Sequence, residues 1–408
     1  MNYKMWMIDQ SSNEGFDISE LVHDIQYTTT LYGQAGKLTF LVEKDPNDEF
    51  KMSLGSLVMF WCDDVPVFYG YAFRIGTDRT ECYQVTAYDQ MRYLQNHDYL
   101  LMEDMSLKQV FEKICAGTRI KNYKLLGKAK TATQKVNKKH FADASYFDML
   151  TYAMQETSNF YVSERVYNDD GTFETMYDPS ATEGVMQVKF FVRDNFGVLE
   201  LNDIESNVKY RRTGIEGGMT RVWTGSEYYY YDESLLPQLE PLIIGDESLL
   251  TDYKYEIDID TETYNDVYIL NTKSDGKSEK TEVRKGEDER YLVTSDGKQL
   301  GIAKQNAESI KKYGTLRRIA NIKSPMTESQ MESYAKLILD NYSTPKKTMK
   351  LEALGYNGVN AGDGFLLRLK KLNYEGMVYV ISATHNYGSD MHTMSLEVCT
   401  AKNMAEVI

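Results

Sequence analysis

The sequence predicts an α+β fold that is mainly β, built around two similar antiparallel units near the two ends of the chain. In residues 38–88 and again in 348–398, apolar side chains alternate with polar ones between Gly, Asn and Asp turns. Period-two alternation with such boundaries is typical of half-buried antiparallel strands. The chain also has 32 Tyr and only 7 Pro, and this composition favours pleated sheets and protein interfaces.

The two β units have closely similar spacing. The interval Gly55–Gly70 is 15 residues and Gly362–Gly376 is 14, whereas Gly55–Tyr88 is 33 and Gly362–Leu396 is 34. Both read as strand, strand opened by Gly, turn, strand containing Gly, polar turn and strand. We therefore predict an internal duplication, with chance similarity between two meanders as the alternative.

Residues 99–205 predict a small α/β insert with two capped helices. Ser106 and Gln109 form a capping box before an apolar i, i+3, i+4, i+7 stripe that stops at Gly117. Ser145 is placed to cap a second helix, and Asp89 a short helix just before the insert. Asn168-Asp169-Asp170-Gly171 predicts a hairpin tip.

Two further segments are dominated by polar or aromatic residues. Tyr228–Tyr231, within the weakly patterned 206–242, suits either an exposed contact patch or a strand edge packed on its own domain. Residues 271–300 are charged and contain Ser-Asp-Gly-Lys twice, at 274–277 and 295–298, which predicts an exposed hairpin pair. We expect a helix at 304–313 and another capped by Thr327 and Gln330.

Composition excludes several classes of function. The formal charge is −15, so the chain is a poor candidate for gripping nucleic-acid phosphates. Such an excess would suit a surface that lets a polyanion slide past, although solubility alone also accounts for it. Four widely spaced cysteines without a CxxC pair argue against a zinc knuckle or disulfide scaffold and fit a reducing cytoplasm. We expect no secretion signal and no membrane span.

No residue pattern predicts catalysis, a cofactor or a metal. His385 and His392 flank one predicted turn and could face each other, but ordinary strand-surface histidines are the simpler interpretation because no further ligand lies nearby. Cys115 and His140 could suggest a peptidase dyad, yet Cys115 ends its helix and a buried cysteine is favoured. GxSxG, HExxH and P-loop motifs are absent from the sequence. Carboxylates are too numerous for a glycosidase pair to stand out.

Several segments resemble one protein family. They are Val85–Leu94, Gly245–Tyr253, Glu308–Gly314 and the stretch from Ala361-Gly362-Asp363 to Met394-Ser395-Leu396. The chain resembles the baseplate hub proteins of contractile phage tails and phage-tail-like bacteriocins of the Gram-positive type. Residues 164–182 and 206–242 look longer than the family pattern.

The resemblance implies a domain organisation. It implies two antiparallel β-barrel domains, each like a tail-tube subunit, with smaller α/β domains inserted between them. The first barrel is expected at 1–98 and the second, discontinuous barrel at 243–272 plus 315–400. A middle α/β insert is expected at 99–242, and a charged hairpin and helix insertion at 273–314.

The resemblance also implies a structural function. Three chains would present six similar units as a ring with a central channel, joining a sixfold tail tube to a threefold spike. Expected partners are two further copies of the chain, the tube ring, the spike and other baseplate proteins, with a tape-measure protein or DNA passing through the channel. The protein would be made in the bacterial cytoplasm and assembled into a phage tail or tail-like particle.

Two alternative functions remain open from the sequence. One is a tail-associated peptidoglycan hydrolase, which zymography would reveal. The other is a secretion-system spike protein, which we would expect to carry a C-terminal β-helix or effector extension.

Overall fold

The computed structural model is mainly β, as the sequence predicts. It describes the whole chain except residues 1, 11, 32, 45–52, 78–81, 131, 133, 137, 158, 168–172, 178–184, 188–189, 205, 213–238, 262, 272–279, 285–288, 295–298, 323–327, 390 and 401–408. The predicted tip at Asn168–Gly171, the Tyr228–Tyr231 segment and both Ser-Asp-Gly-Lys turns lie outside the described residues.

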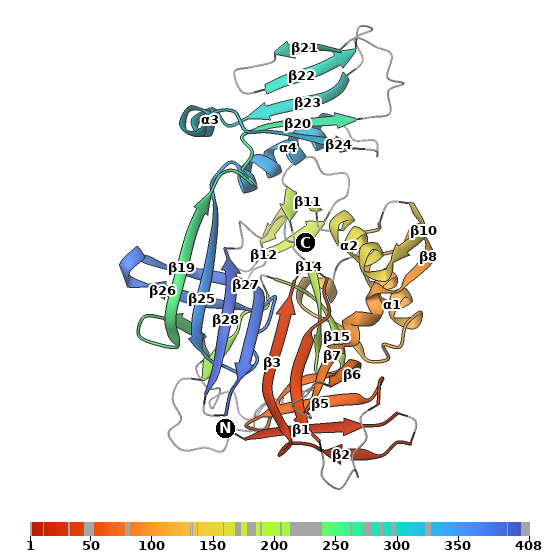
Figure 1. Cartoon of the computed structure of the whole chain (residues 1–408). Helices are drawn as coiled ribbons and strands as arrows, with labels where there is room; N and C mark the ends of the chain where they lie inside the picture. The colour runs from red at the N-terminus through yellow and green to blue at the C-terminus, as the bar shows by residue number, and fades with distance from the viewer. Residues whose placement is uncertain are drawn as a thin grey trace.

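A 13-stranded sheet forms the body of the molecule (Figure 1). The N-terminal unit contributes β1 (Tyr3–Ile8), β2 (Gly15–Asp17), β3 (Val22–Thr30), β4 (Lys37–Glu43), β5 (Leu57–Cys62), β6 (Val65–Thr77) and β7 (Cys82–Asp89), followed by the 3₁₀ helix η1 (Gln90–Gln95). The C-terminal unit contributes β18 (Ile243–Gly245), β19 (Leu250–Asp258), β25 (Lys346–Leu354), β26 (Gly364–Leu369), β27 (Tyr374–Tyr387) and β28 (His392–Cys399), with the 3₁₀ helix η4 (Lys370–Leu372).

The two units have the same strand order. It is β3-β4-β7-β6-β5-β1 in the first unit and β19-β25-β28-β27-β26-β18 in the second. The turn before β5 and the turn before β26 are also alike. Gly55 N–H donates to the Ala72 carbonyl at 2.8 Å, and Gly362 N–H donates to the Val380 carbonyl at 2.9 Å. One pairing differs: β1 is antiparallel to β5, whereas β18 is parallel to β26.

Each unit has its own apolar core. Alternating inward residues of the first unit, such as Phe40, Phe60 and Phe68, form one cluster, and Leu351, Phe365 and their neighbours form another. Among the described residues the strand order runs from β19 to β2 without returning on itself. Two closed barrels therefore remain a prediction.

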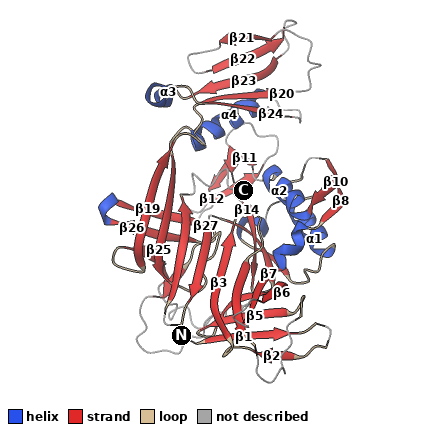
Figure 2. Cartoon of the chain, viewed as in Figure 1, coloured by secondary structure: helices blue, strands red, loops and turns tan. Residues whose placement is uncertain are grey.

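The insert lies beside the first unit and packs two helices on small sheets (Figure 2). Its elements are β8 (His97–Met102), α1 (Leu107–Ala116), β9 (Tyr123–Leu125), η2 (Gly127–Lys130), β10 (Lys139–Ser145), α2 (Tyr146–Glu156), β11 (Asn159–Tyr167), β12 (Phe173–Tyr177), β13 (Val185–Gln187), β14 (Phe190–Asn195), β15 (Val198–Asp203), β16 (Tyr210–Arg212) and β17 (Leu239–Pro241). The Ser106–Gln109 capping box and the Ser145 and Asp89 caps are confirmed.

A separate five-stranded sheet, in the order β21-β22-β23-β20-β24, lies at one end of the molecule. Its strands are β20 (Asp266–Asn271), β21 (Lys280–Arg284), β22 (Glu289–Thr294), β23 (Gln299–Gln305) and β24 (Arg317–Ile322). The same region contains the helices α3 (Ala307–Tyr313) and α4 (Glu328–Tyr342). The helix expected at 304–313 begins at Ala307 because Lys304 belongs to β23 and Asn306 is the N-cap. Thr327, the expected cap of α4, lies outside the described residues.

This second sheet changes the expected boundary of the C-terminal unit. We expected 243–272 plus 315–400 to form one barrel, but β20 and β24 belong to the five-stranded sheet and α4 packs on that sheet. Val267 and Ile269 of β20 are buried against Ala335 and Ile338 of α4. The apolar face of α4 thus joins these segments to their own core, away from β25–β28. None of the described helices is both long and apolar enough to cross a bilayer.

The repeated turn allows a matched stability prediction. Gly55 and Gly362 both have positive φ, +83° and +88°, but a Cβ at Gly362 would lie 2.3 Å from the Phe191 ring, whereas one at Gly55 meets nothing within 4 Å. Gly55→Ala should cost about 1–2 kcal/mol from backbone strain. Gly362→Ala should cost a further 1–3 kcal/mol, roughly, from overpacking. Urea unfolding of both variants measures the difference, and equal losses would contradict the packing of the insert against this turn.

Candidate functional site: the junction between the two β units

The two units are joined by direct strand pairing. The second half of β27 pairs antiparallel with β3, from Ser382 opposite Thr30 to Tyr387 opposite Ile25. The first half of β27 pairs with β26 and most of its length also pairs with β28. Because a strand has only two edges, β26 and β3 must share one edge of β27. The backbone hydrogen bonds therefore run without interruption from one unit into the other.

Polar side chains and one apolar contact reinforce this pairing. The Gln26 amide donates to Asn386 Oδ1 at 2.8 Å, and the hydroxyls of Thr28 and Thr384 are 3.2 Å apart. Beyond the last pair, Leu31 N–H donates to the Ile381 carbonyl at 2.9 Å, and the Leu31 side chain is buried with Ile381. Cross-strand pairs each contribute roughly 0.2–1 kcal/mol.

The insert braces the junction with a buried ion-pair cluster. Arg193, on β14, places Nη1 2.6 Å from Asp363 and Nε 2.9 Å from Glu200. The Asp363 and Glu200 side chains are 0% and 1% exposed. Burial alone would raise the pKa of Glu200, but the Arg193 charge and the Lys124 hydrogen bond outweigh it and lower that pKa. Glu200 is therefore ionised beside Arg193, and the cluster holds β14, β15 and the turn before β26 together.

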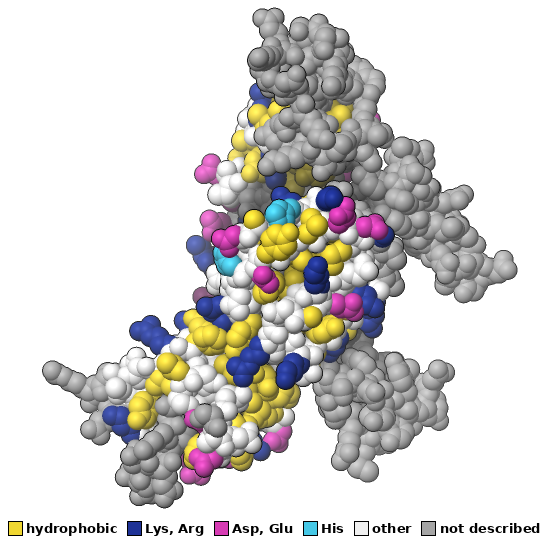
Figure 3. Space-filling view, turned by 90° about the vertical axis from the view of Figure 1, so that its right-hand side faces the viewer, with side chains coloured by type: hydrophobic (Ala, Val, Ile, Leu, Met, Phe, Trp, Pro, Cys, Tyr) yellow, Lys and Arg dark blue, Asp and Glu magenta, His cyan; other side chains and the backbone are white. Residues whose placement is uncertain are grey.

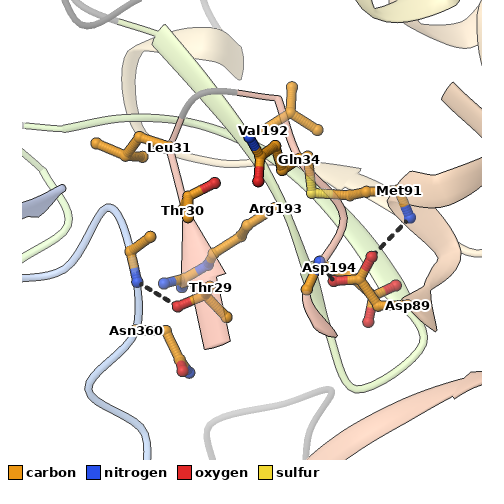
Figure 4. A pocket seen from close by; sticks show the side chains of 12 residues that line it. Thr29, Thr30, Leu31, Gln34, Asp89, Met91, Val192, Arg193, Asp194 and Asn360 are labelled. Atoms are coloured by element: carbon orange, nitrogen blue, oxygen red, sulfur yellow. Dashed lines mark hydrogen bonds between the residues drawn. The ribbon is translucent and has the colours of Figure 1, made fainter. Parts of the chain in front are cut away.

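Asp363 has further partners that fix the turn. Its Oδ2 accepts the Asn360 N–H at 2.8 Å and its Oδ1 accepts the Asn207 amide at 2.8 Å. The same Asn207 amide nitrogen lies 2.8 Å from the Gly362 carbonyl. Ala361 N–H donates to Thr29 Oγ1 on β3 at 3.0 Å, an interaction drawn in Figure 4. One loop thus contacts the first unit, the insert and its own unit.

A small cavity lies between these parts and contains two buried acids. Its volume is about 20 Å³, enough for roughly one water molecule. Asp89 accepts the N–H groups of Gly36 and Met91 at 2.8 and 2.9 Å. Burial raises the pKa of Asp194 to about 6, and burial together with the Asp194 charge raises that of Asp89. A space of this size is too small for a sugar or a peptide.

His385 and His392 face each other as the sequence suggested, but they are buried, 1% and 4% exposed, and not on the strand surface. His385 Nε2 lies 2.6 Å from the Val359 carbonyl, and its Nδ1 lies 2.9 Å from His392 Nε2. A carbonyl only accepts, so His385 carries its proton on Nε2 and accepts from His392 at Nδ1. Burial lowers both pKa values, that of His392 to about 4 with the help of His385.

The other residues singled out in the sequence do not form a site. Burial raises the pKa of the Cys115 thiol to about 12, so it is no activated nucleophile. His140, on β10, packs its ring 4.8 Å from that of Tyr99. In the part of the chain that the structure describes, no group of three or more His, Cys, Asp or Glu is arranged to hold a metal.

Arg193 and Glu200 were not predicted as site residues, since isolated charges in strands look like solvent-facing residues. A signal existed nonetheless. Phe190 and Phe191 precede Arg193 on its strand, and Leu199 and Leu201 flank Glu200, so both charges lie in largely apolar strands. Asp363 lies in the loop predicted before the strand at Phe365 and in a segment that carries the family resemblance, but no ion pair was predicted for it.

Taken together, the fold and the junction define a class of protein: two β units of equal strand order, fused into one sheet, with inserted domains. This fold is shared with three solved tail proteins. They are the 43 kDa tail protein of prophage MuSo2 from Shewanella oneidensis (9% identity, 98% of this chain and 99% of the other, TM-score 0.57), a tail protein of Neisseria meningitidis MC58 (12%, 99% and 99%, 0.57) and prophage tail protein gp18 of Listeria monocytogenes EGD-e (11%, 97% and 94%, 0.54).

The sequence itself assigns the family. The YQBQ-like family matches residues 25–222 and 218–399, which together cover most of the chain. The chain belongs to the YQBQ-like family. No curated protein shows a significant match.

The buried cluster predicts a large effect for one arginine. Arg193→Met keeps the apolar stem but removes the cation that Asp363 and Glu200 share. Each acid then has one lysine partner, Lys209 at 3.4 Å and Lys124 at 2.9 Å, so we expect a loss of about 3 kcal/mol in the free energy of unfolding, at the low end for breaking a buried ion pair. The control is Arg368→Met, which removes an exposed pair with Glu375 of similar length, 2.8 Å, and should change stability little. Urea unfolding compares the two variants. Losses of equal size would show that Arg193 does not brace the junction.

The histidine pair predicts acid sensitivity. Its folded pKa values lie below the usual 6.5, so the unfolded chain binds more protons between about pH 4 and 6.5. Stability contributed by the pair is complete above pH 6.5 and is lost as the pH falls through this window. His392→Gln should flatten the fall in urea midpoint between pH 6.5 and 4.5. The exposed His97→Gln serves as control, and an unchanged slope in His392→Gln would refute this origin.

Proposed function

We propose that the protein is the structural hub of a contractile tail baseplate. Three chains form a ring of six similar units around a central channel. The observation that carries this proposal is that one chain contains the same strand order twice, in units already fused edge to edge. A single chain therefore supplies two neighbouring members of a ring.

The duplication gives such a ring two symmetries at once. Three identical chains have threefold symmetry, while their six β units approximate sixfold symmetry. A tube of six subunits can stack on one face, and a threefold spike can attach where the two units of each chain differ. The units do differ, because only the second has a parallel β18 and receives the five-stranded sheet beside it.

The names of the solved tail proteins support a place in a phage tail. In our proposal the chain is made in the bacterial cytoplasm and assembles into the tail with tube, spike and other baseplate proteins. It transmits load and performs no catalysis. The continuous sheet and the buried Arg193 cluster suit this role, since hydrogen bonds and ion pairs across the junction resist separation of the units.

The proposal predicts the size and symmetry of the assembly. Three chains of 47.0 kDa give about 141 kDa, which native mass spectrometry of purified protein measures. Negative-stain class averages should show a ring with a central channel and six similar lobes. Zymography on peptidoglycan tests the competing enzymatic role. A clear lytic band, or a dimer or tetramer in place of the trimer, would count against the proposal.

A further inference from the structure

We propose that β19 of one chain pairs with the far half of β6 of the next chain, in the register that β3 and β27 adopt within one chain. This inference rests on the proposed ring and assigns the strands that close it. Its partner is a second copy of the same chain, joined by a heterologous contact.

The internal repeat shows which strand edges correspond. In the common strand order β3 corresponds to β19 and β27 corresponds to β6. The second half of β27 is paired with β3. Among the described residues, β5 pairs with β6 only as far as Tyr71, so the second half of β6 has no strand on the edge that β5 uses. Within the same described residues, β19 pairs only with β25, so its other edge is also open. Each chain thus has one open edge of each kind.

These open edges lie on opposite flanks of the molecule, β19 on the left and β6 on the right in Figure 1. A head-to-tail contact needs such an arrangement, because each chain must offer one edge to each neighbour. Unpaired strand edges are also templates for pairing with another chain. The β3–β27 pairing shows that the two kinds of edge fit each other.

The residue register follows from two sets of equivalent pairs. Tyr71 and Tyr379 are equivalent because they pair with Leu57 and Gly364, the first residues of β5 and β26. A register shift follows Ala72 in β6 and Val380 in β27. Adding 308 to the number of a β6 residue therefore gives the number of its equivalent in β27, so Gly76 is equivalent to Thr384.

The second set relates β3 to β19. Tyr27 is opposite Leu38 on β4, and Tyr255 is opposite Met349 on β25. Leu38 and Met349 are themselves equivalent, since they pair with Ala87 and Val398 of the matching strands β7 and β28. Adding 228 to the number of a β3 residue therefore gives the number of its equivalent in β19. The predicted pairs between chains are Arg74–Asp258, Ile75–Ile257, Gly76–Glu256 and Thr77–Tyr255.

The side chains in this register are complementary. Arg74 meets Asp258 of the next chain, an opposite-charge pair, and Ile75 meets Ile257, which is 56% exposed in the single chain. Ile259 is the equivalent of Leu31, which packs on Tyr379 and Ile381.

In the next chain Ile259 would meet Tyr71 and Phe73, the equivalents of those two residues. Phe73 is 37% exposed, and the Arg119 guanidinium lies 4.3 Å from the Tyr71 ring centroid. Figure 3 shows the side of the molecule that lies on the right in Figure 1, where hydrophobic side chains are interspersed with Lys, Arg, Asp and Glu. Nothing used to choose the register depended on these side chains, so their fit is independent support.

Cysteine cross-linking tests the register. Gly76→Cys/Glu256→Cys places thiols on one predicted pair, at positions whose equivalents Thr28 and Thr384 have hydroxyls 3.2 Å apart. A Cβ at Gly76 meets nothing within 4 Å, so the variant should fold. The matched control is Gly76→Cys/Lys254→Cys, on the same face but about 7 Å away along the strand. Thr28→Cys/Thr384→Cys is the positive control within one chain.

After oxidation by copper phenanthroline and dissolved oxygen, the Gly76/Glu256 variant should run on a non-reducing gel as a covalent trimer. The Gly76/Lys254 variant and the wild type, with its own four cysteines, should remain largely single chains. Equal cross-linking of both variants, or none in the first, would overturn the register.

The mass of the reduced proteins separates failure of the two proposals. A reduced trimer without a Gly76–Glu256 cross-link leaves the ring in place and rejects this contact. A reduced monomer without the cross-link rejects both. Cross-linked ladders longer than three chains support the strand contact and reject the closed three-membered ring.

Discussion

The pairing of β27 with β3 is the interaction on which the architecture depends. It joins two β units, which the inserted domain separates in the chain, into one hydrogen-bonded sheet. Backbone pairing fixes both the distance and the rotation between the units, which side-chain contacts alone would leave freer. It also fixes how a third unit could be added, because each unit carries the same two kinds of edge.

The insert stabilises this junction from one side. The ion pairs of Arg193 with Asp363 and Glu200 together offset the free-energy cost of burying its charge. Asp363 is in turn held by hydrogen bonds from the Asn207 amide and the Asn360 N–H. A hydrophobic contact at this point would tolerate sliding, whereas a buried and fully paired arginine allows one arrangement. Phe191 packs beside the positive-φ Gly362 and adds a steric constraint to the same turn. Rigidity at the junction suits the load-transmitting role that we propose.

Much of the fold could be predicted from local patterns. Alternation and turn residues gave the strands of both units, and the capping residues Ser106 and Ser145 gave the helix starts. The spacing after Gly55 and Gly362 indicated a repeat, and the two glycines indeed make equivalent hydrogen bonds. The junction was not predictable, because neither β3 nor β27 carries a signal that names its partner. Nor was the five-stranded sheet, since β20 and β24 read like any other strand.

The sequence by itself determined the mainly β character, the two similar units and the helix caps, because these depend on neighbours within a few residues. Only the tertiary structure decided which edges meet, which charges are buried and that His385 and His392 are hydrogen-bonded to each other inside the protein. The physical reason is that burial and strand pairing depend on residues distant in the chain. A charged or imidazole side chain looks the same in sequence whether water or a buried partner satisfies it.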